Sequence, residues 1–260
     1  MKKWGLLSAE LVRPDGSSPS AAQMADFQNV QTAVLPAYGS IGPTTGPTFA
    51  GLSTGRMRSQ SMPDYVPPVP GTDLGWAGSP PSSYLATHSG ALPSSSGCSG
   101  ICPSGVGAND GVSLRLSIRT PTNAVGQAFV FRFLTAEYPA NLCSTSNDFS
   151  LGLLASGAQG LPADKNIIFD GQGNPLSVNN AWFDVCSPSG CMGCPSGDAG
   201  LTGTGMGAAT QWLPTSAPVV GGEVIVLELM LFDVTTHTGD SVALVDGFHW
   251  GFYYPTWWDD

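Results

Sequence analysis

Residues 223–233 read EVIVLELMLFD, a nearly continuous apolar segment that ends on an aspartate. Apolar side chains on both faces are typical of a strand at the centre of a sandwich. Residues 112–119 and 128–135 instead carry their largest apolar side chains at every second position, the pattern of a strand with one face in a core. Such strands with turn-rich connections predict an all-β fold, an antiparallel β-sandwich similar to a jelly roll.

Further strands are expected on both sides of this centre. Residues 149–154, 166–169 and 241–250 predict three of them, and residues 4–13 predict a strand that opens the sheet. We therefore expect a single β-sandwich domain across residues 1–260. Its parts are a loop-rich segment at 1–109, a core sandwich at 110–250 and an aromatic tail at 251–260.

One short helix is expected near the start of the chain. Met24 and Phe27 belong to a helical pattern within residues 20–34, and the Ser-Pro-Ser at 18–20 supplies a cap. Residues 35–108 hold most of the prolines and small polar residues, which predicts long loops with a few short strands.

The composition limits the classes of partner. The 34 glycines and 22 prolines fit many turns between short strands. A net charge of −10 with only nine lysines and arginines excludes a strong electrostatic footprint for nucleic acid or an anionic membrane. No apolar run reaches the ~18 residues of a membrane span. The basic opening precedes an apolar stretch too short for a signal peptide, so we interpret a mature chain behind an initiator Met, with any leader removed.

An even number of cysteines in loops rich in Ser, Gly and Pro predicts disulfides and an oxidising compartment. The cysteines are Cys98, Cys102, Cys143, Cys186, Cys191 and Cys194. Zinc is the alternative, because Cys191 and Cys194 have ligand spacing and Cys98 and Cys102 offer a second pair. Among the disulfide pairings we favour a local Cys98–Cys102 bridge, with Cys143 joined to the cluster at 186–194.

Acidic residues gather at the predicted strand ends. Strand ends of a sandwich meet on a rim, where convergent carboxylates repel one another unless a cation lies among them. Hard oxygen ligands of this kind suit calcium, which takes six to eight oxygens. The predicted ligands are Asp110, Glu137, Asn147, Asp148, Asp233, Asp240 and Asp246. The alternative interpretation is that these residues only cap turns, as Asp and Asn commonly do.

No motif predicts a catalytic activity. Glu137 with Asp148, or Asp233 with Asp240, has the residue types of a glycosidase acid–base pair, which depends on a carboxyl separation that sequence does not give. Residues 51–55 fit the G-x-S-x-G pattern of a serine hydrolase, but the helix that such an elbow needs is not predicted after it. The three histidines, His88, His237 and His249, share no close spacing, and we interpret them as solvated or packing residues.

Two motifs carry a family resemblance: residues 131–139, FRFLTAEYP, and Ser146-Asn147-Asp148-Phe149. With the closing segment 240–250, DSVALVDGFHW, and the upstream Leu-Ser-Thr-Gly at 52–55, these motifs resemble the choice-of-anchor L domain. The resemblance covers residues 110–250 well and residues 1–109 weakly. It implies a bacterial extracellular, surface-anchored protein and no particular reaction. Ala136 and Gly247 depart from the family's usual Ser and Asn, and the cysteine-rich insert is a further departure.

The last aromatic residues predict either a sugar-binding surface or an interface, because aromatic faces stack on sugar rings and on one another. They are Trp250, Tyr253, Tyr254, Trp257 and Trp258. We expect a non-catalytic secreted or cell-surface structural protein, able to assemble into a fibre or layer and stabilised by calcium and disulfides. The alternatives are a calcium-dependent carbohydrate-binding adhesion module and a glycan-active hydrolase.

Overall fold

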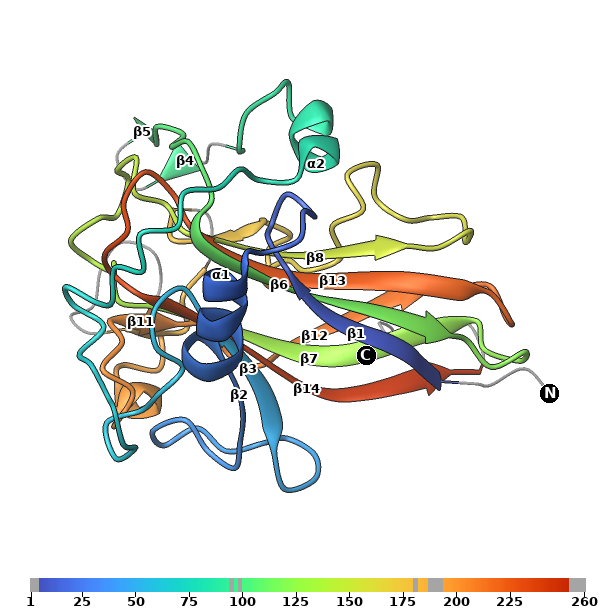
Figure 1. Cartoon of the computed structure of the whole chain (residues 1–260), viewed down its shortest axis with the longest axis horizontal. Coiled ribbons are helices and arrows are strands. Elements are labelled where there is room, and N and C mark those ends of the chain that lie inside the picture. Colours follow the sequence, from blue (N-terminus) through green and yellow to red (C-terminus); the bar gives the residue numbers. More distant parts are fainter. Residues whose placement is uncertain (1–4, 94–95, 98–99, 180–181, 187–193, 253–260) are drawn as a thin grey trace.

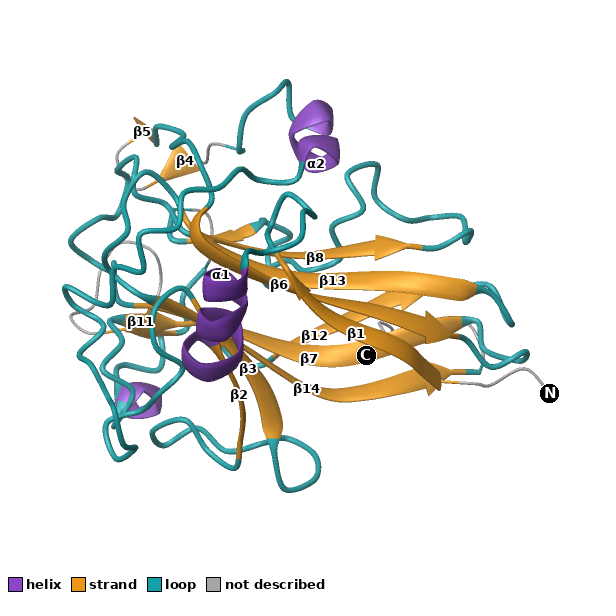
Figure 2. Cartoon of the chain, viewed as in Figure 1, coloured by secondary structure: helices purple, strands orange, loops and turns teal. Residues whose placement is uncertain are grey.

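The computed structural model describes residues 5–93, 96–97, 100–179, 182–186 and 194–252. Two antiparallel sheets pack face to face, and long loops gather at one end of them (Figures 1 and 2). The predicted all-β sandwich is confirmed.

The first sheet contains the segment from which the fold was predicted. Strand β13 (Val224–Asp233) lies between β6 (Asn109–Arg119) and β8 (Phe149–Ala155), so its central position is confirmed. Strand β1 (Gly5–Val12) forms one edge beside β6, and β9 (Leu176–Ser177) forms the other edge beside β8.

The second sheet is built around β7 (Gly126–Thr135) and β14 (Ser241–Gly251), which pair with each other. Next to β14 follow β3 (Phe49–Ser53) and β2 (Thr32–Leu35). The remaining strands are β12 (Leu213–Pro218), β11 (Ala208–Ala209) and β10 (Val185–Cys186) on the other side of β7, and a separate small pair, β4 (Ser96–Gly97) and β5 (Gly100–Ile101).

The main core lies between the two sheets, where Phe131 and Phe133 of β7 face Leu227 and Leu229 of β13. The outer face of β13 is also covered at the loop-rich end. Its Phe232 stacks on Phe149 of β8 at a centroid distance of 6.1 Å, in a cluster that includes Tyr84. Both faces of β13 are therefore buried from Leu229 to Asp233, which explains the continuous apolar sequence of that part.

The predicted helix begins where expected and ends early. Helix α1 (Ala21–Asp26) is capped by Ser20, which forms a capping box with Gln23. The chain continues as the π-helical turn η1 (Phe27–Gln31) and then enters β2 at Thr32, so the helix prediction to residue 34 is wrong in its last residues. A second helix, α2 (Ser82–Thr87), and the 3₁₀ turn η2 (Ala199–Leu201) were not predicted.

Residues 166–169 do not form the predicted strand. Asn166 and Phe169 make only isolated bridges to Leu153 and Pro175. The side chain of Asn166 turns back to accept from the amide of Gly152. Its amide nitrogen also donates to the carbonyl of Ile168 at 2.9 Å, and local side-chain bonding of this kind competes with a continuous ladder.

The disulfides confirm the expected kind of bond and correct its pairing. Cys102 pairs with Cys143, with Cα atoms 4.7 Å apart, and Cys186 pairs with Cys194, at 5.3 Å. The predicted Cys98–Cys102 bridge and the link from Cys143 to the cluster at 186–194 are therefore wrong. The loop after β5 runs beside the loop after β7, since Thr235 bonds both Val106 and Thr145, and this brings Cys102 and Cys143 together. Cys98 and Cys191 lie outside the described residues.

Replacing Ser20 by Ala is expected to destabilise the protein by about 1 kcal/mol, because one backbone donor of α1 loses its acceptor. Urea denaturation measures this change in the free energy of unfolding. Exposed Ser18, two residues earlier, provides the matched control as Ser18→Ala. Equal stabilities of the two variants would contradict a capping role for Ser20.

Candidate metal centre

The strand registers bring five predicted acids to one end of the sandwich. In the first sheet Phe232 pairs with Phe149, so the next residue on β13, Asp233, lies beside Asp148. On its other side Asp233 pairs with Asn109, the neighbour of Asp110. In the second sheet Thr135 pairs with Ser241, which places Glu137 and Asp240 just beyond the same end. This is the loop-rich end, at the left of Figure 1.

The alternation of each strand then turns the acids inward. Asp233 continues the core-facing series of Leu229 and Leu231, and Glu137 continues that of Phe133. All five carboxyl-bearing residues have 2% or less of their surface exposed. The apolar core is thus closed at this end by a buried layer of carboxyl groups.

Three carboxyl groups form the centre of this layer, and we call Glu137, Asp148 and Asp233 the acid triad. The carboxyl of Asp148 is within hydrogen-bonding distance of both others. The Ser241 hydroxyl donates to Asp148 Oδ2 at 2.6 Å, and a hydrogen bond from Thr54 reaches Asp233.

Burial is the main cause that raises the pKa of every member of the acid triad. It raises the pKa of Glu137 to about 7. It raises the pKa of Asp148 well above its usual range, with further contributions from the charges of Asp233 and Glu137. Burial also raises the pKa of Asp233, and repulsion from Asp240 adds to the effect.

The acid triad is short of positive partners. Glu137 Oε2 and Asp233 Oδ1 are buried and receive no hydrogen bond from any donor among the described residues. Within the described ranges, no lysine or arginine forms an ion pair with the acid triad. Buried charges of one sign without a counter-charge are costly, so the triad requires either bound protons or a cation.

Asp240 lies beside the acid triad and holds a loop against it. Its carboxylate accepts from the amide of Thr72 at 3.0 Å and from the backbone of Arg56. A Cβ at Gly55 or Gly71 would overlap this carboxylate, so both loops approach it as closely as glycine permits. Burial, together with repulsion from Asp110, raises the pKa of Asp240 to about 7.

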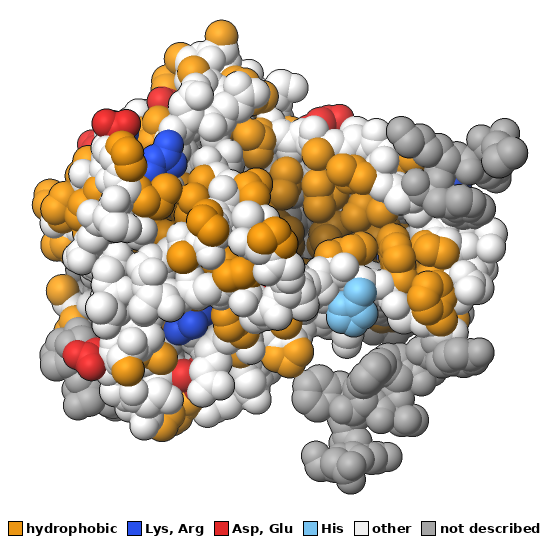
Figure 3. Space-filling model, turned by 90° about the horizontal axis from the view of Figure 1, so that it is seen from below, with side chains coloured by type: hydrophobic (Ala, Val, Ile, Leu, Met, Phe, Trp, Pro, Cys, Tyr) orange, Lys and Arg blue, Asp and Glu red, His pale blue; other side chains and the backbone are white. Residues whose placement is uncertain are grey.

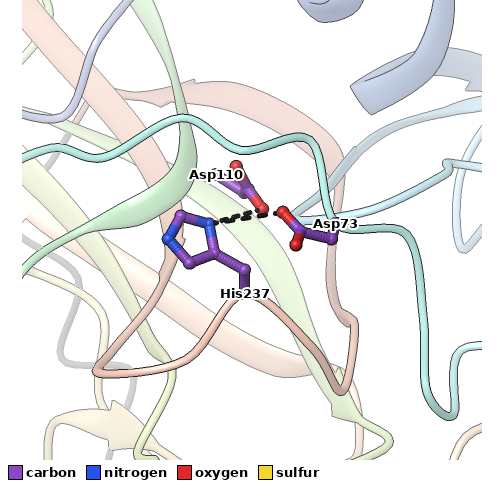
Figure 4. Close-up of side chains that lie close together, drawn as sticks. All are labelled: Asp73, Asp110 and His237. Carbon is purple, nitrogen blue, oxygen red and sulfur yellow. Dashed lines mark hydrogen bonds and ion pairs between the residues drawn. The ribbon is translucent and has the colours of Figure 1, made fainter.

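Asp110 fixes the next part of the same loop, and Figure 4 shows it together with Asp73 and His237. It accepts from the amides of Trp76 at 2.7 Å and Leu74 at 3.1 Å, and its Oδ2 lies 3.0 Å from Nδ1 of His237. Asp73 Oδ1 lies 3.7 Å from the same nitrogen. Sequence reasoning missed Asp73 and His237, because no spacing relates them to Asp110.

Burial raises the pKa of Asp110, and the hydrogen bonds from Trp76, Leu74 and His237 oppose that rise. Asp110 is therefore a loop-holding carboxylate whose oxygens already have donors. It differs in this respect from Glu137 and Asp233 of the acid triad, each of which has an oxygen without one.

Two other predicted ligands have separate roles. Asn147 is buried next to the acid triad, where its Oδ1 accepts from the amide of Asn179 at 2.8 Å. Asp246 does not lie at this end, so the structure does not bring it together with the other predicted ligands. A bulge around Gly247 interrupts β14 there, and Asp246 accepts from the amides of Thr44 and Thr45. Burial alone would raise the pKa of Asp246, but these hydrogen bonds outweigh it and lower the pKa.

The catalytic alternatives do not fit the geometry. Ser53 ends β3 with none of its surface exposed, its hydroxyl accepts from the amide of Gly55, and a loop follows instead of a helix. Asp148 and Asp233 are too deeply buried to reach a sugar chain. The histidines lie apart in the fold, with His88 paired to Asp164 at 3.0 Å.

No protein-family model, curated protein or solved structure matches this chain. In the described part of the chain, no helix has both the length and the apolar character of a membrane span.

Proposed function

We propose that this chain is a non-catalytic structural domain of the bacterial cell surface or of the secreted space, related to the choice-of-anchor L domain. Calcium bound at the acid triad and the disulfides stabilise it. The observation that carries the proposal is the convergence of Glu137, Asp148 and Asp233 in the interior with no cationic partner among the described residues.

The donor set favours calcium over softer metals. The triad supplies carboxylate oxygens, and the hydroxyls of Thr54 and Ser241 adjoin it. Calcium takes six to eight such oxygens in flexible arrangements, whereas zinc prefers nitrogen and sulfur. The donor-free oxygens of Glu137 and Asp233 are those that a cation would take.

The surroundings support a structural role for the cation. The strand ends that carry the triad belong to both sheets, so one ion would hold β7, β8 and β13 together. Asp240 and Asp110 then fasten the loop around residues 71–76 over the same end. A cation that neutralises the carboxylates of the acid triad would therefore stabilise the whole loop-rich end of the sandwich.

The disulfides support an extracellular location, because such bonds persist in oxidising compartments. Cys102–Cys143 joins residues 41 positions apart in the sequence. Closing a loop of this length is expected to add on the order of 3–4 kcal/mol of stability.

Calcium is expected to raise the melting temperature of chelator-treated full-length protein by roughly 5–10 °C at saturation. Isothermal titration calorimetry should show one site that Glu137→Gln loses. Asp246→Asn is the matched control, since that carboxylate lies away from the triad, and it should bind calcium like the parent. An unchanged melting temperature on adding calcium would overturn the proposal.

A further inference from the structure

Two unpaired strand edges lie on one side of the sandwich. In the described part of the chain, β1 pairs with β6 alone. On β14, strand β3 covers only Val242–Val245, so residues 246–251 pair with β7 alone. Helix α1 and η1 close part of this side, where Phe27 enters the core (Figure 1).

The remaining opening is lined by apolar side chains, and Figure 3 shows them gathered in a hollow. We call it the β1/β14 groove. Leu11 and Trp250 are half-buried against the core, and Trp250 meets Phe248 edge to face at 5.1 Å. Leu6 and Phe248 are 53% and 42% exposed. Apolar area of this kind marks an interaction surface.

The groove fits an extended peptide better than a sugar. Open backbone donors and acceptors along β1 and β14 can each pair with an added strand, while the apolar floor accepts its side chains. Edge strands of natural proteins usually carry several charged residues or a proline, which prevent pairing with another strand. The β1 edge carries one charged residue, Glu10, and Asp246 on β14 is already bonded to Thr44 and Thr45.

We propose that the β1/β14 groove binds residues 253–260 of a second copy of this chain, so that copies join head to tail. This inference rests on the proposed structural function. The segment reads YYPTWWDD and follows directly from the end of β14. Its four aromatic residues match the apolar groove, and aromatic residues commonly anchor interfaces.

The sequence favours binding between copies over binding within one copy. To reach its own groove the chain would have to reverse just after β14. Two-residue hairpin turns favour Gly, Asn or Asp, and residues 252–258 contain none of them. Gly251 is held in the β7 ladder opposite Gly126, and Pro255 favours an extended residue before it.

Head-to-tail contacts of this type build open chains when the rotation from one copy to the next does not close a ring. The groove would thus give the surface protein its means of forming a fibre or layer.

Sedimentation of the calcium-loaded full chain across a dilution series tests the inference. We expect concentration-dependent oligomers that disappear when residues 253–260 are deleted. A labelled YYPTWWDD peptide should bind the deleted chain, and Phe248→Glu should weaken that binding at least roughly tenfold. Val34→Glu is the matched control, because Val34 is 71% exposed on β2, which β3 separates from β14.

A full chain that stays monomeric would overturn the inference. If the deleted chain nevertheless bound the peptide, the segment would bind to the groove of its own copy, and the inference would still be overturned. Oligomers that survive the deletion would also overturn it. Calcium binding and melting temperature measured on the same samples keep this result separate from the metal proposal. If the chain were monomeric but still bound calcium, the groove inference would be wrong and the metal proposal would stand.

Discussion

Calcium-free protein is expected to become more stable as the pH falls from about 8 to about 5, the reverse of ordinary acid denaturation. Burial raises the pKa of Glu137 from 4.5 to about 7. Burial, with repulsion from Asp110, raises the pKa of Asp240 from 3.8 to about 7. Between about pH 4 and pH 7 the folded protein keeps protons that the unfolded chain has released, so stability is lost as the pH rises through this window.

At about 1.4 kcal/mol per pKa unit, the shift of Glu137 corresponds to roughly 3.5 kcal/mol and that of Asp240 to roughly 4.5 kcal/mol. The melting temperature of chelator-treated protein should therefore be on the order of 10 °C higher at about pH 5 than at about pH 8. The carboxyl of Asp246 does not contribute to this change, because its pKa is lowered from 3.8 and it titrates below the window.

Added calcium should stabilise the protein far more at about pH 8 than at about pH 5, since protons compete with the ion for the same carboxylates. Differential scanning calorimetry with and without chelator at both pH values measures the effect. A calcium-free melting temperature that rises with pH, or a calcium shift of equal size at both, would contradict the prediction.

The variant Asp233→Asn is expected to change stability in opposite directions with and without calcium. The amide keeps the shape of the side chain but removes one of the buried charges that repel Asp148 and Glu137. At about pH 8 the calcium-free variant should be more stable than the parent by roughly 2–3 kcal/mol. In saturating calcium it should be less stable than the parent, because the site has lost a ligand.

Urea denaturation in chelator and in calcium measures both differences. Asp246→Asn provides the comparison, because it removes a carboxylate that only holds the loop at Thr44 and Thr45. Its small loss of stability should be the same in both conditions. If Asp233→Asn destabilised the protein equally with and without calcium, the acid triad would be a hydrogen-bonding network and not a cation site.

The sequence predicted the acidic end because strand ends and strand alternation are both local properties. Asp233 follows an apolar series on β13 and Asp148 precedes β8, and antiparallel pairing brings these two positions together. Asp246 lies apart from the other acids because the bulge around Gly247 and its place inside β14 depend on tertiary pairing. No local pattern reports such a bulge.

The disulfide pairing was not predictable in the same way. Cys98 and Cys102 are close in sequence, which favoured a local bridge, but loop paths bring Cys102 to Cys143. The sequence did not predict Asp73 and His237 as neighbours of Asp110 for the same reason, since they approach it only after the loop folds over the sandwich. Loop packing is a long-range property that composition and periodicity do not encode.

The Cys102–Cys143 bridge and the acid triad occupy the same end of the molecule, so under the proposed function two chemical signals, an oxidant and calcium, would together stabilise that end. A chain newly made in a reducing, calcium-poor interior would keep that end unlocked, with its carboxyl groups repelling one another. Arrival where both an oxidant and calcium are present would lock it. On this proposal the loop-rich end would become rigid only in a compartment that supplies both.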